Sequence, residues 1–176
     1  MVRKSTTRKF KWFWPWQDEQ EEEWLRDLAL TGLHLRSSDG VGFYTFEHGQ
    51  PAEIVYRLDY NTLAKKDKEQ YLQLFRDAGW EYVGEMNSWQ YFRKPVDAGN
   101  SDEIFTDNES KIEKYKRFLY TTLVMLPIYM MFIVVFDINE RPFLYGMVLG
   151  FFTVCVILLS GIAIKVYLRM QQLKKL

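Results

Sequence analysis

The sequence predicts an α+β protein in which a soluble part precedes a helical hairpin in a membrane. Two observations support the soluble fold: apolar residues alternate along short strand-like segments, and the order strand-helix-strand-strand occurs twice. A third observation supports the hairpin, namely two apolar stretches near the C-terminus without any charged residue or histidine. We expect the tandem units to form one mostly antiparallel sheet of about six strands, with two helices on one face.

The first unit begins with a predicted strand over residues 8–16, along which aromatic side chains recur at every second position. A helix over residues 17–31 follows, because the acidic residues of its first turn suit the positive end of the helix dipole. Gly32 is expected to end this helix. The unit closes with a hairpin around the turn dipeptide Asp39-Gly40. The strands of this hairpin cover residues 33–36 and 43–47.

The second unit repeats this order. Residues 54–60 alternate as a strand, and residues 63–78 show the apolar periodicity of a helix. Gly79 follows this helix as Gly32 follows the first, 47 residues further along the chain. A second hairpin is expected around Met86-Asn87. Its strands cover residues 80–83 and 89–93.

The two apolar stretches are long enough to cross a membrane as helices. At 1.5 Å per residue, residues 118–136 reach about 28 Å and residues 143–164 about 33 Å, close to the thickness of a hydrocarbon core. We therefore divide the chain into a cytoplasmic domain, a linker with a juxtamembrane helix, two transmembrane helices joined by a short extracytoplasmic loop, and a basic tail. In this order the parts cover residues 1–94, 95–117, 118–136, 137–141, 142–164 and 165–176.

The flanking charges predict the orientation of this hairpin. Four basic residues precede the first stretch within residues 111–117, and four follow the second within residues 165–175, whereas the connector holds Arg141 alone. The positive-inside rule then places both termini in the cytoplasm, with the protein in the cytoplasmic membrane.

Composition and missing motifs exclude several classes of function. Residues 1–110 carry a net charge of −6, which argues against nucleic-acid binding because phosphate contacts need a basic surface. One cysteine, Cys155, rules out a disulfide framework and a cysteine-based metal site within the chain. The common nucleophile, nucleotide and zinc motifs are absent from the sequence. We therefore expect no enzyme, no cofactor and no metal. The carboxylates weighed for acid–base chemistry are Glu47, Glu53 and Asp59, which the sequence does not bring together.

Several short motifs resemble those of a known family. They occur in the family's order within residues 9–115, and they are Trp24-Leu25, Ala29 with Gly32, residues 56–60 (YRLDY), residues 78–81 (AGWE), residues 89–94 (WQYFRK) and residues 104–107 (IFTD). This pattern resembles the bacterial family DUF2812, a domain of unknown function whose members commonly carry C-terminal transmembrane helices. The resemblance implies a genomic neighbourhood with PadR-type transcription regulators, and it implies no catalytic residues. The doubled strand-helix-strand-strand unit is also similar to the effector-binding domains of multidrug-responsive regulators.

Aromatic residues on the predicted strands are the candidate binding site. We expect Trp12, Trp14, Tyr56 and Trp89 to form one face that binds a small amphipathic ligand or a protein partner, because aromatic side chains supply large apolar area and dominate interface energetics. The alternative is that these side chains only pack a sheet against its helices. In the second apolar stretch, Gly146 and Gly150 form a G-x-x-x-G pattern that predicts a helix–helix contact.

These expectations lead to three hypotheses for function. The first is a membrane-anchored cytoplasmic sensor or adaptor, without enzymatic activity, that binds an amphipathic ligand, a protein partner such as a PadR-type regulator, or both. The second is an accessory subunit of a membrane transport complex, with the two glycines at the contact. The third is a membrane-bound enzyme.

Overall fold

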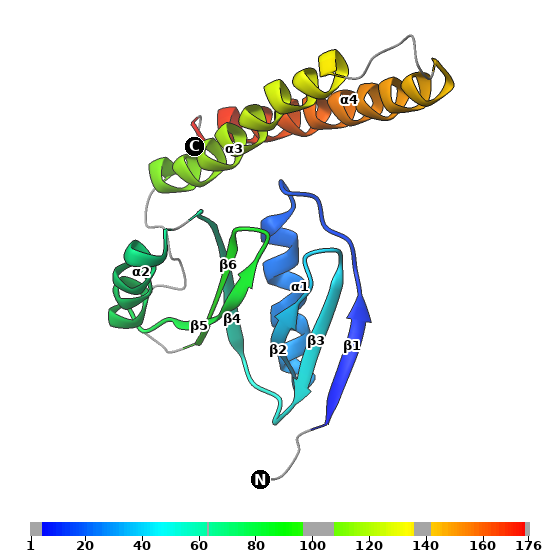
Figure 1. The fold of residues 1–176 in the computed structure, drawn as a ribbon. Coiled ribbons are helices and arrows are strands. Elements are labelled where there is room, and N and C mark those ends of the chain that lie inside the picture. The colour runs from blue at the N-terminus through cyan, green and yellow to red at the C-terminus, as the bar shows by residue number, and fades with distance from the viewer. Residues whose placement is uncertain (1–4, 63, 97–107, 136–141, 175–176) are drawn as a thin grey trace. The chain divides into compact units, whose positions relative to one another are not determined.

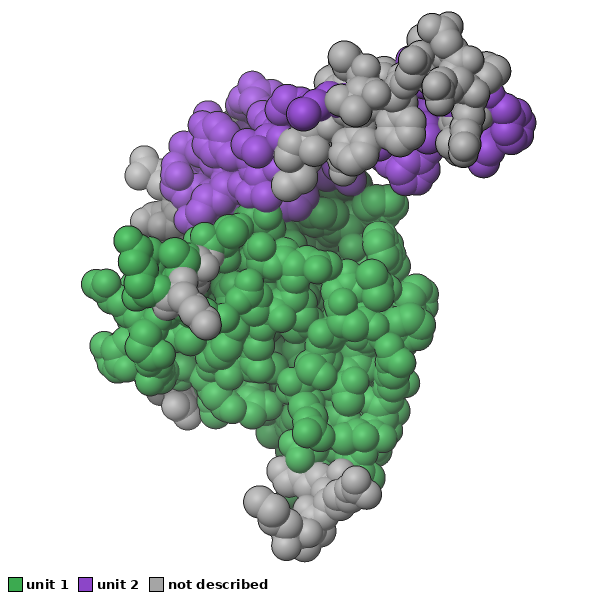
Figure 2. All heavy atoms as spheres, viewed as in Figure 1, with its two compact units in different colours: residues 1–106 green, residues 107–176 purple. Residues whose placement is uncertain are grey.

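The computed structural model describes residues 5–62, 64–96, 108–135 and 142–174. The chain divides into two compact units, unit 1 over Met1–Thr106 and unit 2 over Asp107–Leu176 (Figure 2). Each unit has its own architecture, and unit 1 contains all the aromatic residues predicted to form the binding face.

Unit 1 consists of two modules with the same element order (Figure 1). The first module contains β1 (Thr6–Phe10), α1 (Asp18–Leu30), β2 (Leu33–Ser38) and β3 (Phe43–His48). The second contains β4 (Ile54–Tyr60), α2 (Lys65–Asp77), β5 (Glu81–Met86) and β6 (Trp89–Pro95). The predicted repeat of strand, helix, strand and strand is therefore confirmed, as is the α+β class.

Structural details recur at the predicted separation of 47 residues. Gly32 and Gly79 end α1 and α2 with φ angles of +82° and +83°, the left-handed conformation that glycine adopts at low cost. The pairing of β2 shifts between Leu35 and Ser37, and the pairing of β5 shifts 47 residues later, between Tyr82 and Gly84.

The prediction of one six-stranded sheet is wrong. The strands form two antiparallel three-stranded sheets, sheet A in the order β1-β3-β2 and sheet B in the order β4-β6-β5. The shifted strands β2 and β5 are edges of these sheets, and a bulge bends its strand and disrupts the ladder locally. Side chains join the sheets instead: the hydroxyl of Tyr56 accepts the backbone N–H of Leu35 at 3.2 Å, and Arg93 donates to the Leu35 carbonyl at 3.4 Å.

The prediction that both helices cover one sheet face is also wrong. Helix α1 packs on both sheets, and it shares a core with side chains from each of them. Helix α2 packs on the opposite face of sheet B, where Phe75 stacks on Phe92 with ring centroids 4.2 Å apart. The core around α1 consists of Leu25, Ala29, Leu35, Tyr44, Phe46, Tyr56, Leu58, Met86 and Tyr91.

The first strand is shorter than the sequence predicts. Strand β1 ends at Phe10, so the three tryptophans that follow do not lie on it. The backbone N–H of Gln17 donates to the Trp14 carbonyl at 2.8 Å, which closes a turn through Pro15. Strand β1 ends where its partner begins, because Phe10 pairs with Phe43, the first residue of β3, and the turn at Pro15 then leads the chain into α1.

Unit 2 consists of two long helices, α3 (Asn108–Val135) and α4 (Pro142–Leu173), that pack on each other. Helix α4 extends beyond the predicted apolar span and includes most of the predicted basic tail. Among the side chains that the structure describes in this unit, the buried ones come from the first turns of α3 and the last turns of α4. They include Ile112, Tyr115, Val166, Met170 and Leu173.

One helix among the described residues is long and apolar enough to cross a membrane, Tyr145–Leu173 of α4. The sequence predicts two such spans, and the described residues provide a single candidate. The other predicted span, residues 118–136, corresponds to the last part of α3 and to Phe136, which lies outside the described residues. The predicted loop over residues 137–141 also lies outside them.

Candidate functional site

The four predicted aromatic site residues do not form one face. Trp12 and Trp14 are 52 % and 39 % exposed, whereas the side chain of Tyr56 is completely buried. Trp89 is half-buried against the core, and its ring meets that of Tyr60 edge-on with centroids 5.4 Å apart. Tyr56 links the sheets and Trp89 packs against the core, so of the four predicted residues only Trp12 and Trp14 are exposed for binding.

Other exposed apolar residues accompany these tryptophans at one end of sheet A. The rings of Phe10 and Phe43 lie 4.9 Å apart, and the backbone N–H of Lys11 donates to the Gly42 carbonyl at 2.8 Å. This bond holds the segment after β1 against the loop between β2 and β3. We call the resulting surface the aromatic end; it consists of Phe10, Trp12, Trp14, Val41 and Phe43, all exposed.

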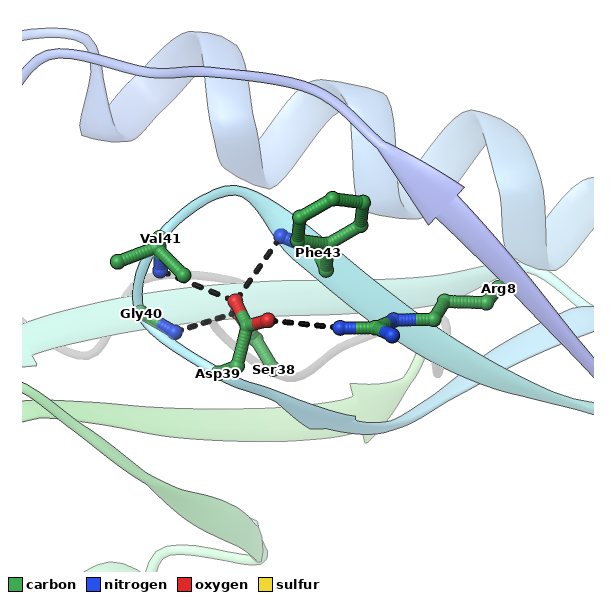
Figure 3. Close-up of polar contacts among 6 residues, drawn as sticks. All are labelled: Arg8, Ser38, Asp39, Gly40, Val41 and Phe43. Atoms are coloured by element: carbon green, nitrogen blue, oxygen red, sulfur yellow. Dashed lines mark hydrogen bonds and ion pairs between the residues drawn. The ribbon is translucent and has the colours of Figure 1, made fainter.

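Asp39 organises the loop that carries Val41 and Phe43 (Figure 3). One carboxylate oxygen accepts the backbone N–H groups of both residues at 3.0 Å, and the other accepts the Arg8 guanidinium at 2.9 Å. Desolvation opposes ionisation of Asp39, but these donors together hold the pKa of its carboxyl below its usual value. An ionised aspartate therefore fixes the loop, and the side chains of Val41 and Phe43 are held in defined positions.

Phe13 determines which side chains of the segment remain outside. Its ring packs against Trp24 of α1 at 5.6 Å and against Tyr44 of β3 at 6.4 Å. Since neighbouring side chains of an extended segment point in opposite directions, Trp12 and Trp14 lie outside when Phe13 lies inside. Their rings meet edge-on at 5.8 Å, and Trp14 stacks on Trp16 at 5.3 Å with an angle of 4° between the ring planes.

Basic side chains lie over the aromatic rings at this end. The Arg8 guanidinium lies 4.2 Å from the centroid of the Phe43 ring, and the Lys11 ammonium lies 5.0 Å from the rings of both Phe13 and Trp24. Such contacts are favourable because the face of an aromatic ring carries negative charge. Arg8, which is ion-paired with Asp39, therefore lies beside the exposed rings, whereas Lys11 lies at the border of the aromatic end, on the side of Phe13 and α1.

A second notable group, which the sequence interpretation missed, is the buried carboxyl of Glu21 on α1. A single oxygen of this carboxyl accepts the hydroxyl of Tyr44 on sheet A at 2.8 Å and the hydroxyl of Tyr91 on sheet B at 2.5 Å. Burial raises the pKa of Glu21 to about 7; the two tyrosine hydrogen bonds oppose this shift, and the charge of Asp18 adds to it. Glu21 thus connects the modules and can change its charge near neutral pH.

A sequence signal for Glu21 was available. Glu21, Leu25 and Leu28 recur at the spacing of one helix face, so helical periodicity places this acid on the apolar stripe of α1. The neighbouring Glu22 is also buried, and its carboxylate accepts the backbone N–H of Leu58 at 2.8 Å on the edge strand β4. These acids satisfy polar groups inside the unit, as buried charges must.

The carboxylates considered for catalysis do not converge. Glu53 forms an ion pair with Arg26 of α1. Asp59 accepts the hydroxyl of Tyr71 of α2 at 2.8 Å. Glu47 pairs with Thr6 on β1 of sheet A, on a different sheet from Asp59. Within the part of the chain that the structure describes, no cluster of three or more histidine, cysteine or acidic side chains could hold a metal ion.

The predicted glycine contact is not made between described residues of the chain. Gly146 and Gly150 are both exposed on α4, and an added Cβ atom at either position would meet no described atom within 4 Å. The two glycines thus form an exposed strip without side chains on the candidate membrane helix, which we call the glycine strip.

The fold and the site define a class of protein with a tandem α+β unit, an exposed aromatic end and a pair of long helices, one of them apolar enough for a membrane. The chain belongs to the family DUF2812, described as a protein of unknown function, whose model matches residues 17–127. Phe10, Trp12 and Trp14 precede the matched residues, and Val41 and Phe43 lie within them. No curated protein and no solved structure matches the chain.

Proposed function

We propose that this protein is a membrane-anchored cytoplasmic adaptor or sensor without enzymatic activity. In this proposal α4 and the apolar part of α3 both cross the membrane, and the basic residues that flank them keep both termini in the cytoplasm. Unit 1 then works beside the membrane and binds an apolar or amphipathic occupant through its aromatic end.

The observation that carries this proposal is the exposure of the aromatic end. Large aromatic side chains grouped on a surface mark interaction sites. Their burial removes much apolar area from water, and a rigid ring loses little conformational entropy. Two of the five residues, Trp12 and Trp14, belong to the residue type most enriched in interface hot spots.

The proposed occupants are a protein partner or a small amphipathic ligand. A PadR-type transcription regulator is the protein partner that the family resemblance suggests. An amphipathic compound would reach the surface from the membrane, where such compounds accumulate, and its binding would then be relayed to the partner.

Affinity capture of the full chain from cross-linked cells tests the proposal. The variant Trp12→Ala/Trp14→Ala removes the rings, and the matched control Leu30→Ala/Leu74→Ala removes exposed leucines from α1 and α2. We expect a partner to be recovered with the wild-type chain and with the control, but not with the tryptophan variant. Equal recovery with both variants, in folded protein, would show that the aromatic end is not the binding surface.

A second candidate function is an accessory subunit of a membrane transport complex. The exposed glycine strip of α4 favours it, since small residues let membrane helices approach closely. In that case Gly146→Leu/Gly150→Leu would abolish capture of the complex, whereas Trp12→Ala/Trp14→Ala would leave it unchanged. A subunit would also be unstable when expressed without its complex.

A further inference from the structure

The aromatic end differs in charge from the rest of unit 1. Residues 8–16 contain three basic and five aromatic residues and no acidic residue, although unit 1 as a whole (residues 1–106) has 14 basic and 18 acidic residues, a net charge of −4. The nearby acid, Asp39, is ion-paired with Arg8 at 2.9 Å. An acidic unit therefore carries one segment that is locally basic and aromatic.

This combination fits the lipid–water interface of an anionic membrane. Tryptophan is enriched at that interface because its ring is apolar while its N–H remains hydrated. Lysine and arginine beside such rings attract anionic headgroups, and they extend their charged ends toward the lipid phosphates. The acidic remainder of unit 1 is repelled by the same charge, so electrostatics favour the orientation in which the aromatic end faces the membrane.

The chain itself keeps unit 1 close to such a surface. Eleven residues, 97–107, connect Val96 to the first residue of α3. A chain of this length reaches at most roughly 40 Å even when fully extended. A tether of this length raises the effective concentration of unit 1 at the membrane, so even a weak surface contact is populated.

We propose that the aromatic end docks into the headgroup region of the membrane that α4 crosses. Phe10, Trp12, Trp14, Val41 and Phe43 enter the interface. Lys9 and Lys11, which alternate with the exposed rings along the segment, lie at the border of this surface and extend toward lipid phosphates. This inference rests on the membrane anchor of the proposed function, and it names lipid as the occupant of the surface; a protein occupant is the competing outcome of the test.

The size of the effect follows from the area that the two tryptophans offer. A tryptophan side chain presents roughly 200 Å² of surface, so a ring that is about half exposed adds about 100 Å² on docking. At the usual free energy per buried apolar area, each ring shifts the ratio of docked to undocked unit by more than about tenfold.

A fluorescent probe beside the aromatic end tests the contact in the full chain. Cys155→Ser removes the one native cysteine, and Val41→Cys then places a single environment-sensitive label in the loop without altering the tryptophans. The matched control is Leu74→Cys on α2, because Val41 and Leu74 are 57 % and 67 % exposed. Both labelled chains are reconstituted into lipid nanodiscs that contain phosphatidylglycerol and a nitroxide-labelled lipid.

We expect nitroxide lipid to quench the label at position 41 and not the label at position 74. Trp12→Ala/Trp14→Ala should abolish the quenching. Lys9→Glu/Lys11→Glu, which retains every aromatic ring, should weaken it, and so should replacement of phosphatidylglycerol by phosphatidylcholine. Equal quenching at both positions, or quenching at position 41 that persists in the tryptophan variant, would overturn the inference.

The result is independent of partner capture. Absence of quenching, together with capture that depends on Trp12 and Trp14, would overturn lipid docking and leave the proposed adaptor function intact. Quenching at position 41, together with equal partner recovery by the wild-type chain and by Trp12→Ala/Trp14→Ala, would support lipid docking. It would also refute a protein occupant at this surface.

Discussion

Replacement of Glu21 by glutamine is expected to change how the stability of unit 1 depends on pH. The carboxyl is buried between the hydroxyls of Tyr44 and Tyr91, which come from different sheets. Glutamine has nearly the same shape, and its side-chain carbonyl can still accept both hydroxyls. It cannot ionise, so the variant isolates the charge of this one side chain.

The magnitude follows from the shift of the pKa on folding. The pKa of Glu21 rises from 4.5 to about 7 in the folded protein because burial penalises the charged form. A difference of about 2.5 pKa units corresponds to about 3 kcal/mol of unfolding free energy. The folded state binds the proton more tightly than the unfolded chain. The wild type therefore has this stability in full below pH 4.5 and loses it as the pH rises toward 7.

Tryptophan fluorescence during denaturant unfolding measures this effect in the full chain. All six tryptophans lie in unit 1, so their emission reports on this unit alone. We expect the stability of Glu21→Gln relative to wild type to increase by about 3 kcal/mol between pH 4 and pH 8. Any cost of the amide that does not depend on pH cancels in this comparison.

The matched control is Glu23→Gln, an exposed acid on the same helix. This control measures what the exchange of a carboxyl for an amide does at an exposed position of α1. Parallel pH profiles for Glu21→Gln and the wild type would refute the reasoning, because the carboxyl would then have the same pKa in the folded and unfolded states.

Three further predictions concern stability, and the same unfolding assay measures them. Gly32→Ala should destabilise unit 1 more than Gly79→Ala: both glycines have positive φ angles, which costs about 1 kcal/mol, but the new Cβ would lie 2.6 Å from a backbone oxygen at Gly32 and 3.4 Å from a flexible lysine at Gly79. Equal losses would contradict this ranking. Phe92→Ala should cost about 3–5 kcal/mol because its ring is fully buried, whereas the exposed Phe10→Ala should change stability by less than about 1 kcal/mol. A large loss for Phe10→Ala would show that its ring supports the fold. Tyr56→Phe should cost about 1–3 kcal/mol, since the N–H of Leu35 loses its buried acceptor; an unchanged stability would mean that this link between the sheets is dispensable.

The repeat and its helices could be predicted because their causes are local. Gly32 and Gly79 end helices through their own backbone conformations, and the spacing of apolar residues determines which helix face is buried. The same spacing places Glu21 on the buried face of α1, but only the structure shows that hydroxyls from two different sheets meet at its carboxyl. A contact between distant segments leaves no periodic signal.

Trp12 and Trp14 illustrate the corresponding difference for the binding surface. Because Phe13 lies between them in the sequence, either Phe13 or the two tryptophans must face the core. The sequence does not indicate which, because all three residues are aromatic. The contacts of Phe13 with Trp24 and Tyr44 decide this. Tyr56, by contrast, was predicted to lie on the binding face, but its ring lies in the core.

The sequence alone determined the α+β class, the duplicated unit, the helix ends and an apolar segment able to cross a membrane, because each depends on residues near one another in the chain. The tertiary structure decided that the strands form two sheets, that α1 and α2 pack on different surfaces, and that the first aromatic segment leaves the sheet at Phe10. These features depend on which edges, bulges and side chains meet across long separations in sequence, where packing and hydrogen bonding override local preference.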